Sequence, residues 1–394
     1  MRWDILPTGA AQYASIVPCG VIAVALRFLA SFALTLALAG ILPAQFQAPL
    51  RSPEVHPDGR VTFSIKAPNA KEVFVSREGI EKIAMQKGED GIWTVVSEPW
   101  EPDYYGYSFQ VDGVNLIDPA NPSMKPNLLN TTSMVHIPGD ASLPWEVRDV
   151  PRGALHHHFY KSQAAEDRRD FYVYTPPGYD PKGSTLYPVL YLLHGYSDDA
   201  SGWSAVGMAH VILDNLIAQK KAKPMLVVMP LGYGTMEVIR DPRNAFRDPK
   251  MLEKNFGRFR QTLLDEVIPQ VESGYRVRQE KQARALAGLS MGGAETLFVA
   301  LNAPDRFQFV GAFSSGGLPE EFERIFPKVD ESINEQLSAI WIACGVDDRL
   351  IAVNRKFSEW LKEKKVQHNF VETPGSHSWL VWRRYLATFT TKIF

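Results

Sequence analysis

A serine set between two glycines marks the sequence GLSMGGAETL at residues 288–297. Ser290 has Gly288 two places before it and Gly292 two places after it. The residues leading to it, ARALAGLS, are strand-like, and the following MGGAETLFVAL has the composition of a helix. On such a turn the serine backbone is strained and neighbouring segments pass close by, so side chains at the flanking positions would clash. The pattern therefore predicts a nucleophilic hydroxyl at a helix start.

A nucleophilic serine needs a histidine base and a carboxylate that orients it, here expected in the order Ser, Asp, His. Of nine histidines, His377 in TPGSHSWLVW follows the last predicted strand and precedes the last predicted helix, so it can reach Ser290. The acid is expected in ACGVDDRL, where Asp347 and Asp348 end a strand. Successive residues leaving a strand point in different directions, so only one of the two can reach the histidine. The residues alone leave that choice open.

The tetrahedral intermediate of acyl transfer needs two hydrogen-bond donors for its oxyanion. Met291 directly follows the nucleophile and offers its backbone N–H at the helix start. Tyr196 lies in the loop after the strand-like PVLYLLHG, where the second backbone donor is expected. Trp203 is a candidate for lining the acyl site, with burial in the core as the alternative.

The histidine run at 156–158 raises the alternative of a metal site, because His156 and His158 could share one strand face. The sequence offers no identifiable further ligands, so we expect no metal and no other cofactor. His194, at a strand end, is expected to shape the backbone rather than to abstract a proton. Cys344, in the apolar run AIWIACG, is expected to be a buried structural thiol.

Residues 146–394 alternate apolar strand-like runs with helical patterns, which predicts an α/β domain with a mostly parallel sheet covered on both faces. The segment 231–255 has no clear pattern and is long for a connection, so it is expected to border the pocket with Tyr233, Phe246 and several arginines. The predicted strands are DFYVYTP, PVLYLLHG, PMLVVMP, ARALAGLS, FVGAFSS, AIWIACG and HNFVETPG. Helices are predicted over 208–221, 257–272, 291–303 and 354–365.

Residues 49–145 are predicted to form a small all-β sandwich. Period-two alternation in VTFSI, further runs in EVFVS, IWTVVSE and YYGYSFQV, and a hairpin signal at Asp112-Gly113 support it. The order PDGRVTFSIKAPNAKEVFV resembles early-set sandwiches related to glycogen-binding modules. Its aromatic residues could stack on sugars, but filling the core and the domain contact is the favoured role, which would make the sandwich a spacer or pocket wall. These residues are Trp93, Trp100, Tyr104, Tyr105 and Tyr107.

Residues 1–48 are expected to be a signal peptide or N-terminal leader. The apolar run 28–42 follows Arg27, and Ala44 and Ala48 offer small residues for cleavage. An uncleaved membrane anchor over 21–42 is the alternative. The expected location is therefore periplasmic or secreted, with membrane contact only through an uncleaved leader. The net charge of −2 gives no electrostatic footprint for nucleic acid.

Four stretches, YPVLYLLHGYSDDASGW, RALAGLSMGGAETL, CGVDDRL and GSHSWLVWRRYL, together resemble the esterase family of feruloyl, acetylxylan and enterochelin esterases. The resemblance also includes VYTPPGYD and LLDEVIPQVESGYRV, so it covers nearly all of residues 150–394. It implies an α/β-hydrolase fold, Ser290 as nucleophile and His377 as base. The family's Gly-x-x-Asp spacing selects Asp348, although the double aspartate departs from the family pattern.

The resemblance implies a serine carboxylic ester hydrolase, feruloyl esterase-like, that releases hydroxycinnamates from plant cell-wall polysaccharide through an acyl-enzyme. Enterochelin ester hydrolysis, acetyl removal from xylan and acyl transfer on the same scaffold remain alternatives. A catalytically inactive carbohydrate-binding protein is a further class, against which the complete set of serine, histidine and aspartate argues. The expected partner is a small-molecule or polysaccharide-linked ester, and the oligomeric state is left open.

Overall fold

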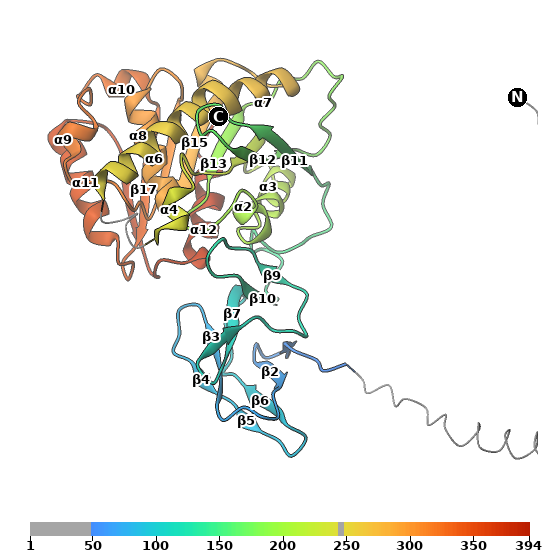
Figure 1. The fold of residues 1–394 in the computed structure, drawn as a ribbon. Helices are drawn as coiled ribbons and strands as arrows, with labels where there is room; N and C mark the ends of the chain where they lie inside the picture. Colours follow the sequence, from blue (N-terminus) through green and yellow to red (C-terminus); the bar gives the residue numbers. More distant parts are fainter. Residues whose placement is uncertain (1–48, 243–247) are drawn as a thin grey trace, which may run out of the picture. The chain divides into compact units, whose positions relative to one another are not determined.

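Three β-sheets organise the chain in the computed structural model, which describes residues 49–242 and 248–394 (Figure 1). The predicted leader at 1–48 and Phe246 lie outside the described residues. Residues Leu50–Phe394 form one compact unit.

The first two sheets are antiparallel and form the all-β part of the chain. One has the strand order β1-β2-β6-β5, and the other has the order β4-β3-β7-β10-β9 with β8 paired to β7. Alternate side chains of β2 and β7, such as Phe63 and Tyr107, meet in a shared core. The strands are β1 (Glu54–Val55), β2 (Val61–Lys66), β3 (Val73–Arg77), β4 (Ile83–Ala84), β5 (Gln86–Lys87), β6 (Ile92–Val96), β7 (Asp103–Val111), β8 (Val114–Leu116), β9 (Met124–Lys125) and β10 (Thr132–Ile137).

Four of the five aromatic residues considered for sugar stacking are buried in this core, namely Trp93, Trp100, Tyr105 and Tyr107. The fifth, Tyr104, stacks on the His136 ring at 4.1 Å. The interpretation that these side chains fill the core and the contact between the two parts is confirmed.

The third sheet has eight strands in the order β11-β12-β14-β13-β15-β16-β17-β18. The strands from β14 to β18 along this order are parallel, and β11 and β12 are antiparallel to their neighbours. The strands are β11 (Ala154–Lys161), β12 (Arg168–Thr175), β13 (Val189–Leu193), β14 (Leu226–Pro230), β15 (Arg284–Leu289), β16 (Phe309–Phe313), β17 (Ala339–Gly345) and β18 (Asn369–Thr373). This architecture confirms the predicted α/β-hydrolase fold, in which a small all-β region precedes a mostly parallel sheet in the sequence.

Helices cover both faces of this sheet. Successive strand residues point to opposite faces, so neighbouring residues belong to different cores. Tyr191 belongs to the core covered by α6, α8 and α11, and Leu192 to the core covered by α3 and α12. The helices are α2 (Gly202–Ala205), α3 (Ala209–Ala218), α4 (Glu237–Arg240), α6 (Pro249–Gln261), a π-helical segment η1 (Thr262–Val267), α7 (Ile268–Gly274), a 3₁₀ turn η2 (Lys281–Ala283), α8 (Met291–Asn302), α9 (Phe322–Ile325), α10 (Ile333–Gln336), α11 (Ile351–Glu363) and α12 (Trp379–Thr390).

The segment 231–255, in which the sequence showed no clear pattern, contains helical structure. It contains α4 and the beginning of α6, which starts eight residues before the predicted position 257. The Asp248 side chain accepts a hydrogen bond from Lys250 N and caps this helix. The cap lies among charged residues with little apolar content, so the apolar pattern alone did not reveal it.

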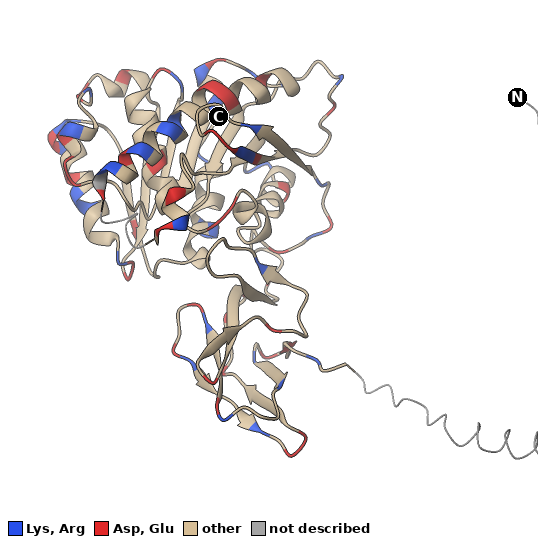
Figure 2. Cartoon of the chain, viewed as in Figure 1, with Lys and Arg blue, Asp and Glu red and all other residues tan. Residues whose placement is uncertain are grey.

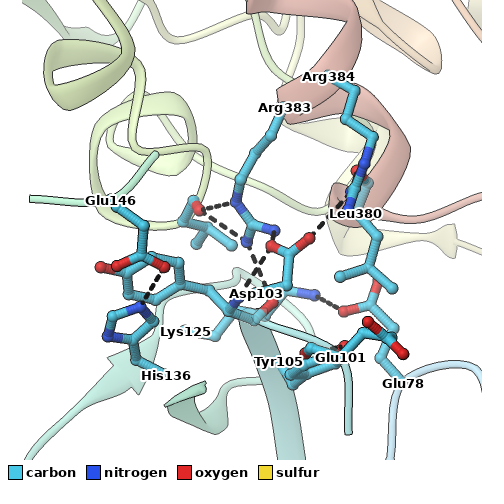
Figure 3. A network of polar contacts seen from close by, with 12 residues as sticks. Glu78, Glu101, Asp103, Tyr105, Lys125, His136, Glu146, Leu380, Arg383 and Arg384 are labelled. Atoms are coloured by element: carbon cyan, nitrogen blue, oxygen red, sulfur yellow. Dashed lines mark hydrogen bonds and ion pairs between the residues drawn. The ribbon is translucent and has the colours of Figure 1, made fainter. Parts of the chain in front are cut away.

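A buried ion pair joins the all-β part to the last helix of the α/β part (Figure 3). Asp103, the first residue of β7, lies 2.5 Å from Arg383 of α12, and its other carboxylate oxygen lies 2.9 Å from Arg384. The Arg383 guanidinium also donates to the carbonyl oxygens of Tyr104 and Val206. Because both side chains of the first pair are only 1% exposed, neither has water as an alternative partner.

Positions of Lys and Arg (blue) and of Asp and Glu (red) are interspersed along the helices of the α/β part (Figure 2). None of the helices described here has the length and apolar character needed to cross a membrane.

Candidate active site

Ser290 lies on the turn between β15 and α8, at the carboxyl edge of the central sheet. Its backbone has φ 51° and ψ −117°, a region that non-glycine residues rarely adopt. The turn is fixed by hydrogen bonds from Ser290 N to Phe313 O and from Gly316 N to Ser290 O. The strained turn that the sequence predicted therefore presents this hydroxyl at the end of a buried strand.

The two flanking glycines are required by close approaches of the backbone. A Cβ at Gly288 would lie 2.3 Å from the carbonyl oxygen of Gly292. A Cβ at Gly292 would lie 2.4 Å from the carbonyl oxygen of His194. Both neighbours are backbone atoms that cannot move aside, so any larger residue would displace the turn.

His377 connects Ser290 to a carboxylate through both of its ring nitrogens. Its Nε2 lies 3.0 Å from Ser290 Oγ. Its Nδ1 lies 3.0 and 2.8 Å from the two carboxylate oxygens of Asp348. Since a carboxylate can only accept, Nδ1 carries the proton, and Nε2 is left to accept from the serine hydroxyl. The ring also meets Trp382 edge to face at 4.8 Å.

The two aspartates after β17 lie in different surroundings. Asp347 is exposed, whereas the Asp348 carboxylate is buried beneath His377. Burial would raise the pKa of Asp348, but hydrogen bonds from His377 and from the Leu350 N–H outweigh it and hold this pKa below its ordinary value. The buried carboxylate thus stays ionised and can hold the histidine in one tautomer.

The loop after β13 passes close to Ser290. A Cβ placed on Gly195 would lie 3.4 Å from the Ser290 Cβ, so Tyr196 follows directly beside the serine. Met291 is the first residue of α8, where the backbone N–H groups have no partner within the helix. The two residues predicted as oxyanion donors thus both lie next to the serine.

His194 and Tyr233 support this loop from behind. His194 Nδ1 donates to Gly195 O and its Nε2 accepts from Gly232 N, so the ring shapes the backbone as expected. The Tyr233 hydroxyl donates to Asp198 O, and the side chain is fully buried. Tyr233 therefore does not line the cavity as the sequence suggested, because the segment that carries it packs under the loop.

A cavity of about 230 Å³ opens at Ser290 and His377. Its aromatic walls are Tyr196, Trp379 and Trp382. Trp203 does not line it, which corrects the sequence-based expectation: this side chain is 0% exposed and packs behind Trp379 with ring centroids 5.1 Å apart. Its Nε1 donates to Leu193 O, so Trp203 is a buried core residue, which was the alternative interpretation.

The sequence did not identify Trp379 and Trp382 as cavity residues. Their positions two and five residues after His377 were the available signal.

Residues of the all-β part form one side of this cavity. Glu78, Lys125 and Asn127 line it together with Arg349, the residue after Asp348. These four residues also line an adjoining polar cavity of about 520 Å³. Lys125 and Glu78 form an ion pair of 2.9 Å. No sequence motif placed Glu78, Lys125 or Asn127 near a serine more than 150 residues away.

The histidine run at 156–158 lies on the edge strand β11, where each ring has a separate partner. His156 bonds Thr175, His157 bonds Asp170 and His158 bonds Tyr275. Across the described residues, no group of three His, Cys, Asp or Glu side chains is arranged to hold a metal ion. Cys344 is buried as expected, and burial raises the pKa of its thiol to about 12.

A hydroxyl, an imidazole and a carboxylate in one hydrogen-bonded line can transfer an acyl group. The histidine can take the serine proton, and the carboxylate can stabilise the resulting imidazolium. The family model described as "Putative esterase" matches residues 162–393. The chain belongs to this family.

Curated relatives of this esterase-family chain include a protein named as a xylanase/feruloyl esterase and one named as an acetyl esterase. It is 30% identical over 350 residues to an endo-1,4-beta-xylanase/feruloyl esterase of Xylanibacter ruminicola, covering 87% of this chain and 46% of that protein. It is 25% identical over 232 residues to an acetyl esterase of Caldicellulosiruptor saccharolyticus, covering 50% of this chain and 80% of that protein. The chain thus spans less than half the length of the first relative.

Solved structures share the fold of this chain. A ferulic acid esterase from Anaeromyces mucronatus matches with a TM-score of 0.56 and 22% identity, over 65% of this chain and 96% of that chain. The enterobactin esterase from Shigella flexneri matches with a TM-score of 0.63 and 18% identity, over 84% of this chain and 92% of that chain. The match to the enterobactin esterase covers 84% of this chain, which is more than the third sheet and its helices contain. The likeness in fold therefore includes part of the all-β region.

Proposed function

We propose that the protein is a serine carboxylic ester hydrolase in which Ser290, His377 and Asp348 form the catalytic triad. The proposal rests on one observation, the continuous line of hydrogen bonds from Ser290 Oγ through His377 to Asp348. Membership of the esterase family supports it independently.

In this mechanism Ser290 Oγ attacks the ester carbonyl while its proton moves to His377 Nε2. The backbone N–H groups of Met291 and Tyr196 stabilise the oxyanion of the tetrahedral intermediate. The intermediate collapses to an acyl-enzyme as His377 gives the proton to the leaving alcohol. A water molecule then repeats the sequence on the acyl-enzyme, releasing the acid and restoring Ser290.

We propose a hydroxycinnamate ester of plant cell-wall polysaccharide as the substrate. The Xylanibacter ruminicola relative, named as a xylanase/feruloyl esterase, supports this class. The cavity of about 230 Å³ at Ser290 suits one small acyl group, and Trp379 and Trp382 offer aromatic walls for a flat ring. The adjoining polar cavity of about 520 Å³ offers room for a hydroxylated alcohol portion.

Hydrolysis of catecholate siderophore esters is a second candidate. Arg349 lines the cavity, and its guanidinium suits an anionic ligand, whereas Lys125 is already paired with Glu78. The acetyl esterase relative keeps acetylated xylan among the substrates to be measured. Acyl transfer would use the same residues, with a sugar hydroxyl in place of water.

A panel of purified substrates tests the proposed function: methyl ferulate, feruloylated arabinoxylan, acetylated xylan, a catecholate siderophore and 4-nitrophenyl acetate. We expect the highest kcat/KM for the feruloyl esters. The variant Ser290→Ala should lose at least 10³-fold in kcat, roughly the scale found when a triad member is removed. A wild-type protein inactive on every ester, or a variant that keeps its activity, would reject the proposal.

Export to the periplasm or the medium is part of the proposal. The apolar run at residues 28–42 in the sequence supports it. Fractionation of cells that express the full chain tests it, and recovery of the protein only in the cytoplasm would reject it.

A further inference from the structure

The loop that carries Tyr196 is held by a loop of the all-β part. Residues 126–131 connect β9 to β10 and run alongside residues 195–198. The backbone N–H of Leu128 donates to Ser197 O at 2.7 Å. The side chain of Asn127 adds two further bonds, from Nδ2 to Ser197 Oγ at 2.9 Å and to Asp198 Oδ1 at 3.2 Å.

The two ends of the Asn127 amide have different tasks. Oδ1 accepts from the backbone N–H groups of Leu129 at 3.0 Å and Asn130 at 2.9 Å, which folds the loop that contains Asn127. Nδ2 donates only across the contact, to Ser197 and Asp198. A substitution can therefore remove one task and leave the other.

The segment 196–198 needs such support because its conformation is unfavourable by itself. Ser197 has φ 68°, a left-handed backbone conformation that is unfavourable for a non-glycine residue. Asp198 is only 5% exposed, so its carboxylate needs hydrogen-bond donors. Without them, the loop would relax toward a different backbone path, and the Tyr196 N–H would move with it.

We propose that Asn127 is a positioning residue for ester hydrolysis: its amide fixes residues 196–198, so that the Tyr196 N–H points at the oxyanion formed on Ser290. This inference rests on the proposed function and extends it, since it makes the all-β part a component of the oxyanion site. Asn127 acts through the loop and forms no bond to the reacting atoms.

The electrostatics around Asp198 agree with this role. Burial raises the pKa of Asp198 to about 7, with Asp199 and Glu78 adding to the rise, while Lys125 and the Asn127 amide lower it. The Asn127 donor thus favours the ionised carboxylate that it holds. Replacing the donor with a second carboxylate would place two like charges together, with an effect that grows as the pH rises.

The test compares Asn127→Asp and Asn127→Ala with the wild type, using methyl ferulate and 4-nitrophenyl acetate. Neither substrate carries a sugar, so loss of polysaccharide binding cannot affect the result. Because an oxyanion donor acts in the transition state, kcat should fall about 10- to 100-fold while KM stays within about threefold. The deficit of Asn127→Asp should grow between pH 6 and pH 8.

The aspartate variant keeps the acceptor oxygen that folds the loop, so it separates positioning from folding. Asn115→Asp makes the same charge change on the exposed strand β8, outside both cavities, and should match the wild type. Thermal melting and titration of active Ser290 with a phosphonate ester establish that each variant is folded.

Three outcomes would overturn the inference while the wild type hydrolyses esters. Both variants could keep kcat within twofold, the loss could appear in KM instead, or Asn127→Asp could match the wild type while Asn127→Ala is impaired. A wild type inactive on all esters would instead reject the proposed function.

Discussion

His377 Nδ1 lies 2.8 Å from Asp348 Oδ2, although the preceding residue, Asp347, is also an aspartate. Asp347 is exposed, and its backbone N–H donates to Gly375 O. The chain turns at Gly345, whose carbonyl oxygen accepts from Asp348 N. This turn sends the second carboxylate inward beneath the histidine and leaves the first at the surface.

The two aspartates should therefore differ strongly in a kinetic comparison. Asp348→Asn should lower kcat by about 10⁴, because the amide carries no charge to stabilise the imidazolium and its NH2 group can donate to His377 Nδ1, which favours the wrong tautomer. Asp347→Asn should change kcat by less than about threefold, as expected for a surface residue. Steady-state kinetics on 4-nitrophenyl acetate measures both. The reverse ranking would assign the orienting carboxylate to Asp347.

Asp198→Asn should make the protein more stable, by an amount that depends on pH. Burial raises the folded-state pKa from 3.8 to about 7, so below pH 3.8 the carboxyl is protonated in both states and has no effect on stability. As the pH rises to 7 the unfolded state ionises first, which destabilises the folded wild type by up to ~4 kcal/mol. Asparagine does not ionise, so the difference in unfolding free energy should grow from pH 4 to pH 7 and then level off.

Urea denaturation of both proteins across pH 4 to 8 measures this difference. All other titrating groups are shared, so they cancel in the comparison. A difference that is flat with pH, or that favours the wild type more as pH rises, would contradict the prediction.

Arg383→Met should destabilise the protein because it leaves the Asp103 carboxylate buried with fewer partners. Both side chains are 1% exposed, and breaking a buried pair from one side typically lowers stability by about 3–5 kcal/mol. The remaining bonds to Asp103, from Arg384 and from Tyr104 N, make a loss near 3 kcal/mol the expected value.

The double variant Asp103→Leu with Arg383→Met should recover part of this loss, since it removes the buried charge as well. Denaturation monitored by tryptophan fluorescence measures both variants. A loss below about 1 kcal/mol in the single variant would mean that water reaches this contact.

Chelator treatment should leave the hydrolysis rate unchanged. Serine, histidine and aspartate together carry the proposed acyl transfer, and each ring of the run at 156–158 already bonds a different protein partner. Rates measured before and after dialysis against EDTA check this expectation. A loss that added zinc restores would point to a metal role for that run.

Local signals in the sequence singled out Ser290 and His377, whereas the residues left Asp347 and Asp348 open and the resemblance to the family selected Asp348. A strained turn requires glycines at fixed positions, and a triad histidine follows a strand end. The buried strands β13 to β17 were also predicted, since an apolar run between turn residues is typical of a parallel sheet. The edge strand β11 was not included among the predicted strands, because both of its faces are partly open and its residues show no apolar alternation.

The residues around Ser290 and His377 could not be predicted in this way. Trp203 and Tyr233 are aromatic residues near the site in sequence, yet both are fully buried behind it. A sequence does not show which side of a loop faces a cavity. Asn127 and Lys125 reach the site because the connection between β9 and β10 contacts the loop after β13, a long-range contact that no sequence periodicity signals.

The cavity at Ser290 is lined by both the all-β part and the α/β part, which limits how this protein can evolve by exchanging one part for another. The residues that close the site on one side, Glu78, Lys125 and Asn127, lie in the all-β part, and Ser290 lies in the other. A recombination event that replaced the first 140 or so residues would preserve the serine and its partners but lose those side chains. The two parts should therefore be inherited together, and selection for a new substrate can act on the all-β part while Ser290, His377 and Asp348 stay unchanged.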